Sequence, residues 1–434
     1  MNAIVLGNGR SGKAAAELLR RSGNLVCMLD GKDVWPDGTW ELCVTSPGIP
    51  LDHPWQIAAR AAGVRVISEL QLGAERFRAM GGRMVAVTGS KGKSSVVKLL
   101  ADALGGIPCG NYGKPLCEVA LEGLTEKGTL PVAVVEVSSF QMETTDLPPD
   151  AFEAAAILNL QEDHLDRHGS VEVYHALKRK LLDFAVSGIE SPGCDDKGTG
   201  YSETEMCFAK NNKTPLDINL LANSYFDNPV LRSNGLCAVA LMRAMGLDDA
   251  SIKAAFARFK ALPHRMQVVC VRDGVTWIDD SKATSISALI AGVKMAVSQF
   301  NHDIPSVSPF SGENRRDFEG AIPNVRLIAG GQPKGDDPIA ARECLSGGVA
   351  RVYLIGRCAA AFAEAWKDVV PCEICGTLEV AVAAAGRDAA EGECVLLSPG
   401  TASFDQFANY GERGDRFSME VLRPERCQME KRHL

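Results

Sequence analysis

The sequence lacks the features of membrane-embedded and nucleic-acid-binding proteins. No run of 18 apolar residues occurs among its 434 residues, and the chain enters an apolar stretch at residues 3–6 without a basic-then-apolar signal segment. Its 46 Lys and Arg residues are outnumbered by 54 Asp and Glu residues, which leaves a net charge of −8. Binding to nucleic acid or a membrane surface through bulk charge would need a basic excess. We therefore expect a cytoplasmic protein with neither partner.

Paired cysteines are also scarce. The 14 cysteines are scattered singly, and several, such as Cys43 and Cys237, lie inside apolar runs, where a reduced thiol behaves as a small hydrophobic residue. Only Cys372 and Cys375 form a Cys-x-x-Cys motif, and no second pair or neighbouring histidine accompanies them. The pattern argues against a disulfide scaffold and against a zinc site, and it fits a reducing compartment.

A glycine turn between an apolar run and a helical pattern is the strongest feature present. Residues 84–87 predict a buried strand, residues 88–92 a turn, and residues 94–100 a helix. Gly89 and Gly92 followed by Lys93 would offer exposed N–H groups, a helix dipole and a positive charge to a polyphosphate. Two residues rather than four separate the glycines, which indicates a shortened phosphate loop. The alternative is an ordinary strand-to-helix turn.

A second glycine motif lies near the N-terminus. The predicted strand at residues 3–6 is followed by Gly7-x-Gly9-x-x-Gly12 and a helical pattern, and the next strand ends at Asp30, 18 residues after Gly12. This arrangement predicts a Rossmann-like unit that binds a nucleotide diphosphate, with the acid on a ribose hydroxyl. The motif does not distinguish NAD from other diphosphates. The stretch is short for a full dinucleotide domain.

Polar residues follow two further apolar strands. Glu136 ends the run at residues 131–135, where a carboxylate facing a phosphate loop is a candidate magnesium ligand, the alternative being a solvated strand end. Residues 154–158 lead into a dense polar cluster that contains His164. Lys178 is one of three consecutive basic residues, which on sequence alone predicts a solvated helix face.

The pattern as a whole predicts an α/β protein with three domains. We expect a Rossmann-like N-terminal domain at residues 1–82, a central parallel-sheet domain of the P-loop ATPase type at 83–262 and a Rossmann-like C-terminal α/β domain at 263–434. The last domain should begin with a hairpin around Asp273-Gly274. Residues 299–322 resemble an insertion.

In this order the motifs resemble the Mur ligases of peptidoglycan synthesis, most closely their glutamate-adding branch. The motifs that carry the resemblance span residues 7 to 417 and include Ser46-Pro-Gly-Ile, Gly110-Asn-Tyr-Gly, Glu136-Val-Ser-Ser-Phe-Gln, Asp163-His-Leu-Asp-Arg, Leu262-Pro-His-Arg, Asp280-Ser-Lys-Ala-Thr and Ser398-Pro-x-x-Ala-Ser-Phe-Asp-Gln-Phe.

The resemblance implies an ATP-dependent amide ligase acting on UDP-N-acetylmuramoyl-L-alanine. ATP would phosphorylate the substrate carboxylate, and the amine of glutamate, D-glutamate being expected, would attack the acyl phosphate. Lys93, Glu136, His164 and Lys178 would be catalytic. Ser94 and Glu136 would hold one Mg²⁺ and His164 a second, and Lys178 would be carbamylated by CO₂ to give an anionic metal ligand.

The resemblance also implies three binding sets, and with them a first domain that binds UDP rather than NAD. The ATP set is Gly89, Ser90, Lys91, Gly92, Lys93, Ser94, Ser95, Asn234, Arg265 and Asp280. The UDP-substrate set is Gly7, Gly9, Arg10, Ser11, Asp30, Ser46, Pro47, Gly48, Ile49 and Asn111. The glutamate set is Lys282, Thr284, Lys334, Ser403 and Tyr410. We expect a monomer.

The chain departs from the family pattern at several positions. Lys91 and Ser285 stand where the family usually has asparagine, and Tyr410 stands where it usually has phenylalanine. These changes leave open a sister ligase that uses L-glutamate, another amino acid or folate. A dinucleotide-dependent dehydrogenase would leave the phosphate loop unexplained, and a non-catalytic UDP-sugar-binding relative would not need Lys93, Glu136 and His164.

Overall fold

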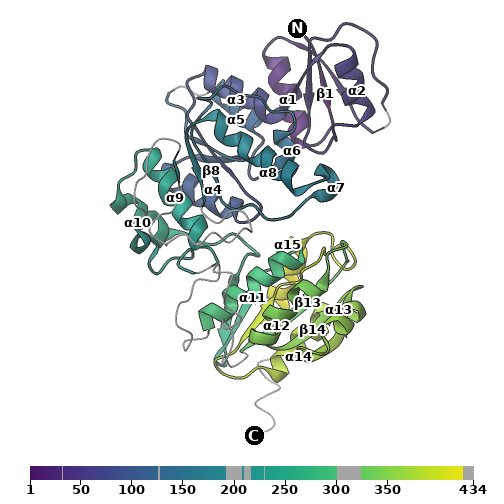
Figure 1. Cartoon of the computed structure of the whole chain (residues 1–434), viewed down its shortest axis with the longest axis vertical. Helices are drawn as coiled ribbons and strands as arrows, with labels where there is room; N and C mark the ends of the chain where they lie inside the picture. The colour runs from purple at the N-terminus through teal and green to yellow at the C-terminus, as the bar shows by residue number, and fades with distance from the viewer. Residues whose placement is uncertain are drawn as a thin grey trace. The chain divides into compact units, whose positions relative to one another are not determined.

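A computed structural model describes residues 1–31, 33–125, 128–191, 208–209, 217–228, 230–300 and 324–423. The chain divides into two compact units, one of Met1–Asp227 with Leu231–Phe259, the other of Asn228–Val230 with Lys260–Leu434 (Figure 1). The α/β class is confirmed, whereas the division into three domains stays a prediction. The expected insertion lies outside the described residues except for its first two positions.

The first unit begins with a small parallel sheet of strand order β2-β1-β3-β4. Apolar residues from both faces of β1 are buried, so helices cover both faces: α1 packs on one and α2 on the other (Figure 1). The elements are β1 (Asn2–Leu6), α1 (Arg10–Arg21), β2 (Leu25–Leu29), β3 (Leu42–Thr45), α2 (Pro54–Ala61) and β4 (Arg65–Ser68).

The second sheet of this unit has the order β10-β9-β8-β5-β7-β6. All its strand pairs are parallel except β9 with β10, so the carboxyl ends of β5, β7 and β8 meet at one edge. The strands are β5 (Met84–Thr88), β6 (Ile107–Gly110), β7 (Ala133–Glu136), β8 (Phe152–Ile157), β9 (Ala185–Glu190) and β10 (Phe208–Ala209).

Helices cover both faces of this second sheet. One apolar cluster joins it to α3 (Glu69–Ala79) and α5 (Leu116–Gly123). The other cluster joins it to α4 (Lys93–Leu104), α9 (Arg232–Ala244) and α10 (Asp249–Arg258). Short helices fill the connections: α6 (Ser139–Met142), α7 (Leu165–His168), α8 (Val171–Arg179), η1 (Lys180–Phe184) and η2 (Ile218–Leu221).

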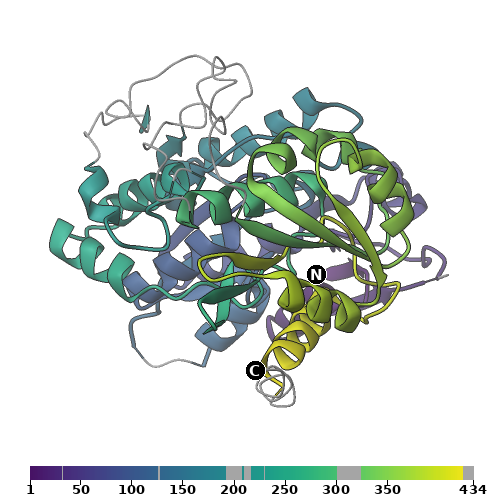
Figure 2. The same ribbon diagram turned by 90° about the horizontal axis from the view of Figure 1, so that it is seen from below.

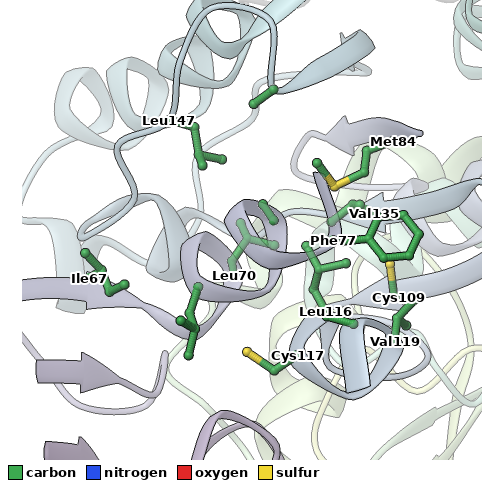
Figure 3. Close-up of a cluster of buried hydrophobic side chains, with 14 of the residues drawn as sticks. Ile67, Leu70, Phe77, Met84, Cys109, Leu116, Cys117, Val119, Val135 and Leu147 are labelled. Atoms are coloured by element: carbon green, nitrogen blue, oxygen red, sulfur yellow. The ribbon is translucent and has the colours of Figure 1, made fainter. Parts of the chain in front are cut away.

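The two sheets of the first unit share one hydrophobic cluster, drawn in Figure 3. Helix α3 follows the last strand of the first sheet, yet its Leu70 and Phe77 pack with Leu116 of α5 and Met84 of β5. Fully burying a side chain such as Phe77 stabilises the fold by about 1.5–3 kcal/mol. The shared cluster therefore holds the two sheets together.

The second unit holds a sheet of order β11-β12-β16-β13-β14-β15. It opens with the expected hairpin, whose turn residues Asp273 and Gly274 have φ values of 50° and 73°. The strands are β11 (Gln267–Arg272), β12 (Val275–Asp279), β13 (Val325–Gly330), β14 (Val349–Ile355), β15 (Cys372–Gly376) and β16 (Cys394–Leu397).

The helices of this unit lie on both faces of the sheet. Apolar residues of α11 (Ile286–Phe300), α12 (Arg342–Gly348) and α13 (Ala359–Trp366) share one cluster with η3 (Pro338–Ala341). The opposite cluster contains α14 (Leu378–Asp388) and α15 (Tyr410–Leu422), the yellow helix of Figure 2. Among the described residues, no helix has the length and apolarity needed to cross a membrane.

A buried carboxyl at the start of α3 lies beside the shared cluster. Glu69 Oε1 accepts a hydrogen bond from Cys117 N at 2.7 Å, while its Oε2 is buried and has no hydrogen-bond partner within the described part of the chain. Burial raises the pKa of Glu69 from 4.5 to about 7. The folded protein therefore keeps a proton there that the unfolded chain releases near pH 4.5.

We predict that this proton makes the wild type lose stability as pH rises from about 5 through 7. In Glu69→Gln this loss should be smaller. The free energy of unfolding of the variant should exceed that of the wild type by about 1–3 kcal/mol at pH 8 and should differ little from it at pH 5. Urea unfolding at the two pH values measures this. Glu75→Gln, on the exposed side of the same helix, is the control; an equal pH effect in both variants would contradict the assignment.

Candidate active site

A phosphate loop of the predicted form connects β5 to α4. Gly89 has φ 146°, and Gly92, the residue that caps α4, has φ 83°, so both need the conformational freedom of glycine. Lys93 is the first residue of the 12-residue helix. The N–H groups of that first turn have no partner within the helix and can bind an anion.

Two asparagines brace the loop. Asn159, just after β8, accepts from Lys91 N at 2.8 Å and donates to Lys91 O at 2.9 Å. Its Nδ2 also lies 3.1 Å from Asn234 Oδ1. Asn159 was missed as an individual site residue, although it begins the polar cluster that follows an apolar strand.

Two lysines converge on one carbonyl oxygen of the loop. Lys93 Nζ donates to Gly89 O at 2.7 Å and Lys178 Nζ donates to the same oxygen at 2.9 Å. Lys178 is only 1% exposed, so its interpretation as a solvated helix face is wrong. Burial first, and then the charge of Lys93, hold the pKa of Lys178 well below its usual value.

Glu136, at the end of β7, is a buried carboxylate rather than a solvated strand end. It is 2% exposed, and Asn111 Nδ2 donates to its Oε1 at 2.7 Å. Its Oε2 is buried and has no hydrogen-bond partner among the described residues. A buried carboxylate oxygen of this kind fits a divalent cation, and Ser94 lies buried in the first turn of α4.

His164 lies in the turn that precedes α7, in a left-handed conformation with φ 54°. Its ring packs 4.9 Å from that of Phe140, and Asp163 beside it pairs with Lys91 at 3.5 Å. No cluster of three or more His, Cys, Asp or Glu side chains suited to a metal occurs in the described ranges. A Mg²⁺ ion at Glu136 would therefore complete its shell with phosphate oxygens and water, as Mg²⁺ commonly does.

The glycine motif of the first sheet lies beside the 46–49 turn. A Cβ on Gly12 would lie 1.9 Å from Gly7 O, and one on Gly7 would lie 3.0 Å from Ser46 Oγ, so the two segments are in close contact. Ser46 Oγ is buried without a hydrogen-bond partner among the described residues. Asp30 is exposed.

Gly9 and Ser11 lie at the start of α1 with Arg10. The Arg10 side chain donates to Gly113 O at 2.8 Å and pairs with Glu118.

In the second unit, Asp280 and Lys282 occupy the loop after β12. Asp280 Oδ2 accepts from Ser398 Oγ at 3.0 Å, and burial raises its pKa to about 7. Lys282 Nζ lies 4.0 Å from the centre of the Tyr410 ring. Ser403 is buried, Lys334 is exposed, and Arg265 and Thr284 are partly buried.

A fully buried arginine, missed on sequence, organises this part of the second unit. Arg413 donates to Ser281 Oγ at 2.9 Å, to Ser281 O at 2.9 Å and to Thr401 O at 3.2 Å. Burial lowers the pKa of Arg413 to about 10. It ties the loops after β12 and β16 to α15.

Comparison with known proteins agrees with this arrangement. A family model described as the Mur ligase middle domain matches residues 87–197. The chain is 34% identical to a UDP-N-acetylmuramoylalanine–D-glutamate ligase of Sphingopyxis alaskensis, over 96% of each chain. It is 32% identical to the enzyme of the same name from Thiobacillus denitrificans, over 98% of this chain and 97% of the relative.

Solved structures show the same fold at low sequence identity. The UDP-N-acetylmuramate–alanine ligase of Thermotoga maritima superposes with a TM-score of 0.54 at 16% identity, over 99% of this chain and 100% of that one. The MurF ligase of the same organism, solved with ADP, gives 0.53 at 14% identity, over 90% and 96%.

The contacts of Asn159 and Asn234 with the phosphate loop predict the effect of a methyl group at Gly92. A Cβ there would lie 2.2 Å from Asn234 Nδ2, on a backbone with positive φ. Gly92→Ala should therefore lower the free energy of unfolding by about 2–4 kcal/mol. It should also weaken nucleoside triphosphate binding at least about tenfold. Gly105→Ala, at the other end of α4, has positive φ but open space and should cost only about 1 kcal/mol. Equal nucleoside triphosphate binding in the two variants, measured by calorimetry, would contradict the support of the loop by these asparagines.

Proposed function

The chain belongs to the Mur ligase family, and on that premise we propose that it joins D-glutamate to UDP-N-acetylmuramoyl-L-alanine at the expense of ATP, in peptidoglycan precursor synthesis. The observation that carries the proposal is the pair of lysines on the carbonyl of Gly89, next to a helix start. Two lysine side chains and a helix N-terminus at one point of the loop attract an anion, and the γ-phosphate of ATP is an anion that a phosphate loop binds.

The loop residues stabilise charge that develops on the transferred phosphoryl group. Lys93 is held by Gly89 O and Ser90 O, so its ammonium is already placed before ATP arrives. The N–H groups at the start of α4 add fixed dipoles. This step would move the γ-phosphoryl group from ATP to the substrate carboxylate and release ADP. The glutamate amine would then attack the acyl phosphate, lose a proton and displace phosphate to give the amide.

Two Mg²⁺ ions would neutralise the phosphate oxygens and bring the γ-phosphate to the carboxylate. Ser94 and Glu136 would hold one ion and His164 the other. The Oε2 atom of Glu136, which is buried and has no hydrogen-bond partner where the structure describes the chain, supports the first assignment. Asn111 fixes that carboxylate through its Oε1 and leaves Oε2 for the ion.

Lys178 would act as a carbamate. Because burial and the charge of Lys93 lower its pKa, the neutral amine, which is the form that attacks CO₂, is favoured over its usual population in an exposed lysine. The ammonium first loses one proton, and the neutral amine then forms a nitrogen–carbon bond to CO₂ and loses a second proton, so that a cation becomes a carbamate anion that can bind metal. The change also places a negative group, in place of a second amine, beside the ammonium of Lys93.

The binding sets implied by the resemblance complete the proposal. The 46–49 turn and the Gly7–Gly12 segment would hold the UDP portion, Asn234, Arg265 and Asp280 would contact ATP, and Lys282, Thr284, Lys334, Ser403 and Tyr410 would position glutamate. The stacking of Lys282 on Tyr410 supports a place for a carboxylate beside that ring. We propose a monomer that works in the cytoplasm.

Phosphate release tests the function. With ATP, Mg²⁺ and UDP-N-acetylmuramoyl-L-alanine, we expect turnover with D-glutamate and at least about a hundredfold less with L-glutamate, because a pocket that places one amine for attack misplaces that of the mirror image. Turnover with L-glutamate alone would move the protein to the sister branch, and turnover with neither would remove the proposal.

Replacing the carbamate candidate gives a second test. Lys178→Ala should lower kcat by at least about 10³-fold, with partial recovery on adding a short carboxylic acid such as acetate or formate. Arg179→Ala removes the neighbouring surface cation, which pairs with Glu190, and should keep kcat within about twofold. Full activity in Lys178→Ala would end the carbamate assignment.

A further inference from the structure

Helix α7, which begins directly after His164, carries an ion pair that reaches the first sheet. Arg167 donates to both carboxylate oxygens of Glu143, at 2.9 Å and 2.6 Å. The two side chains are 15% and 5% exposed. Their geometry is the bidentate fork that only arginine offers a carboxylate.

The same guanidinium contacts the turn that follows β3. Arg167 donates to Ile49 O at 3.2 Å, and Pro47 O lies 3.5 Å away. Residues 46–49 follow β3 of the first sheet, whereas α7 lies in the connection between β8 and β9 of the second sheet. One side chain therefore joins the turn proposed to hold the UDP portion to the helix that begins beside His164.

Aromatic and polar contacts connect Arg167 to His164. The Phe140 ring lies 5.0 Å from the Arg167 guanidinium and 4.9 Å from the His164 ring. Glu143 also lies 3.4 Å from His168 Nδ1, and His168 Nε2 is 3.0 Å from Ser139 Oγ. Arg167 and His164 are thus packed against the same ring in one contiguous network.

We propose that Arg167 is a positioning residue that fixes the distance between the 46–49 turn and His164. The inference rests on the proposed function: the substrate would bind by its diphosphate at the turn and react at its carboxylate near His164. A shift of one end relative to the other would misplace the carboxylate from the γ-phosphate, and displacement by about 1 Å can cost a hundredfold in rate.

Two substitutions separate positioning from stability. Arg167→Lys keeps a cation beside buried Glu143 but cannot form the fork and also reach Ile49 O. Arg167→Gln removes the charge. Arg83, directly before β5, is the control because it also forms a bidentate pair, with Glu153 of β8 at 2.6 Å and 2.7 Å, at a more exposed position and with no hydrogen bond to the 46–49 turn among the described residues.

We expect Arg167→Lys to melt within a few degrees of the wild type, yet to raise KM for UDP-N-acetylmuramoyl-L-alanine about tenfold and lower kcat about tenfold, with KM for ATP nearly unchanged. Arg167→Gln should change KM for the UDP substrate and kcat in the same directions by larger factors, again with KM for ATP nearly unchanged. Amide hydrogen exchange in residues 46–50 should quicken in both variants without ligand. Arg83→Lys and Arg83→Gln should show neither effect.

Each outcome decides a separate claim. A wild type without turnover would remove the proposed function and this inference with it. An active wild type with normal exchange at residues 46–50 in the Arg167 variants would overturn the inference alone. Faster exchange with unchanged KM for the UDP substrate would also overturn it, because Arg167 would then serve only stability.

Discussion

The constraint on which the active site depends is the burial of positive charge at the carboxyl edge of the central sheet. Lys93 and Lys178 both donate to the carbonyl oxygen of Gly89, and the N-terminal end of the α4 helix dipole is also positive. A proton on Lys178 would therefore lie close to the charge of Lys93. Like charges in a low-dielectric setting repel strongly. The folded protein therefore contains an electrostatic imbalance that an anionic ligand or a carbamate on Lys178 relieves.

The surrounding architecture maintains this unfavourable arrangement. Asn159 holds the backbone of the loop at Lys91 and itself donates to Asn234, and the strands on either side of β5 run parallel to it. The cluster around Phe77 attaches the first sheet to the same scaffold. A strained site persists only when the surrounding structure stabilises it by more free energy than the strain costs.

Local sequence predicted the parts of the site that depend on local rules. Glycines in an obligatory backbone conformation identify the loop, and an apolar run followed by an acid identifies Glu136, because both signals lie within a few residues. The hairpin at Asp273-Gly274 follows from turn chemistry in the same way. The resemblance added the roles of His164 and Lys178, which no local pattern contains.

What could not be predicted depends on contacts between distant segments. Lys178 lies in a basic run, and only the packing of α8 against the loop buries it. Arg167 reaches a carbonyl 118 positions away in the chain, and Arg413 reaches one 132 positions away. Strand β15 carries no local signal, because its five residues, two of them cysteines and one a charged glutamate, do not form an apolar run.

Arg413 has a consequence for the loops of the second unit that carry Ser281 and Tyr410. Its guanidinium is fully buried and donates to the hydroxyl and carbonyl oxygens of Ser281 and to the carbonyl oxygen of Thr401, so it ties these loops together within the chain itself. If these loops bind an amino acid as proposed, little loop entropy is lost on binding. Substitutions at Lys282 or Tyr410 would then change the contacts to the amino acid while the frame stays intact, so amino-acid preference and folding would evolve separately.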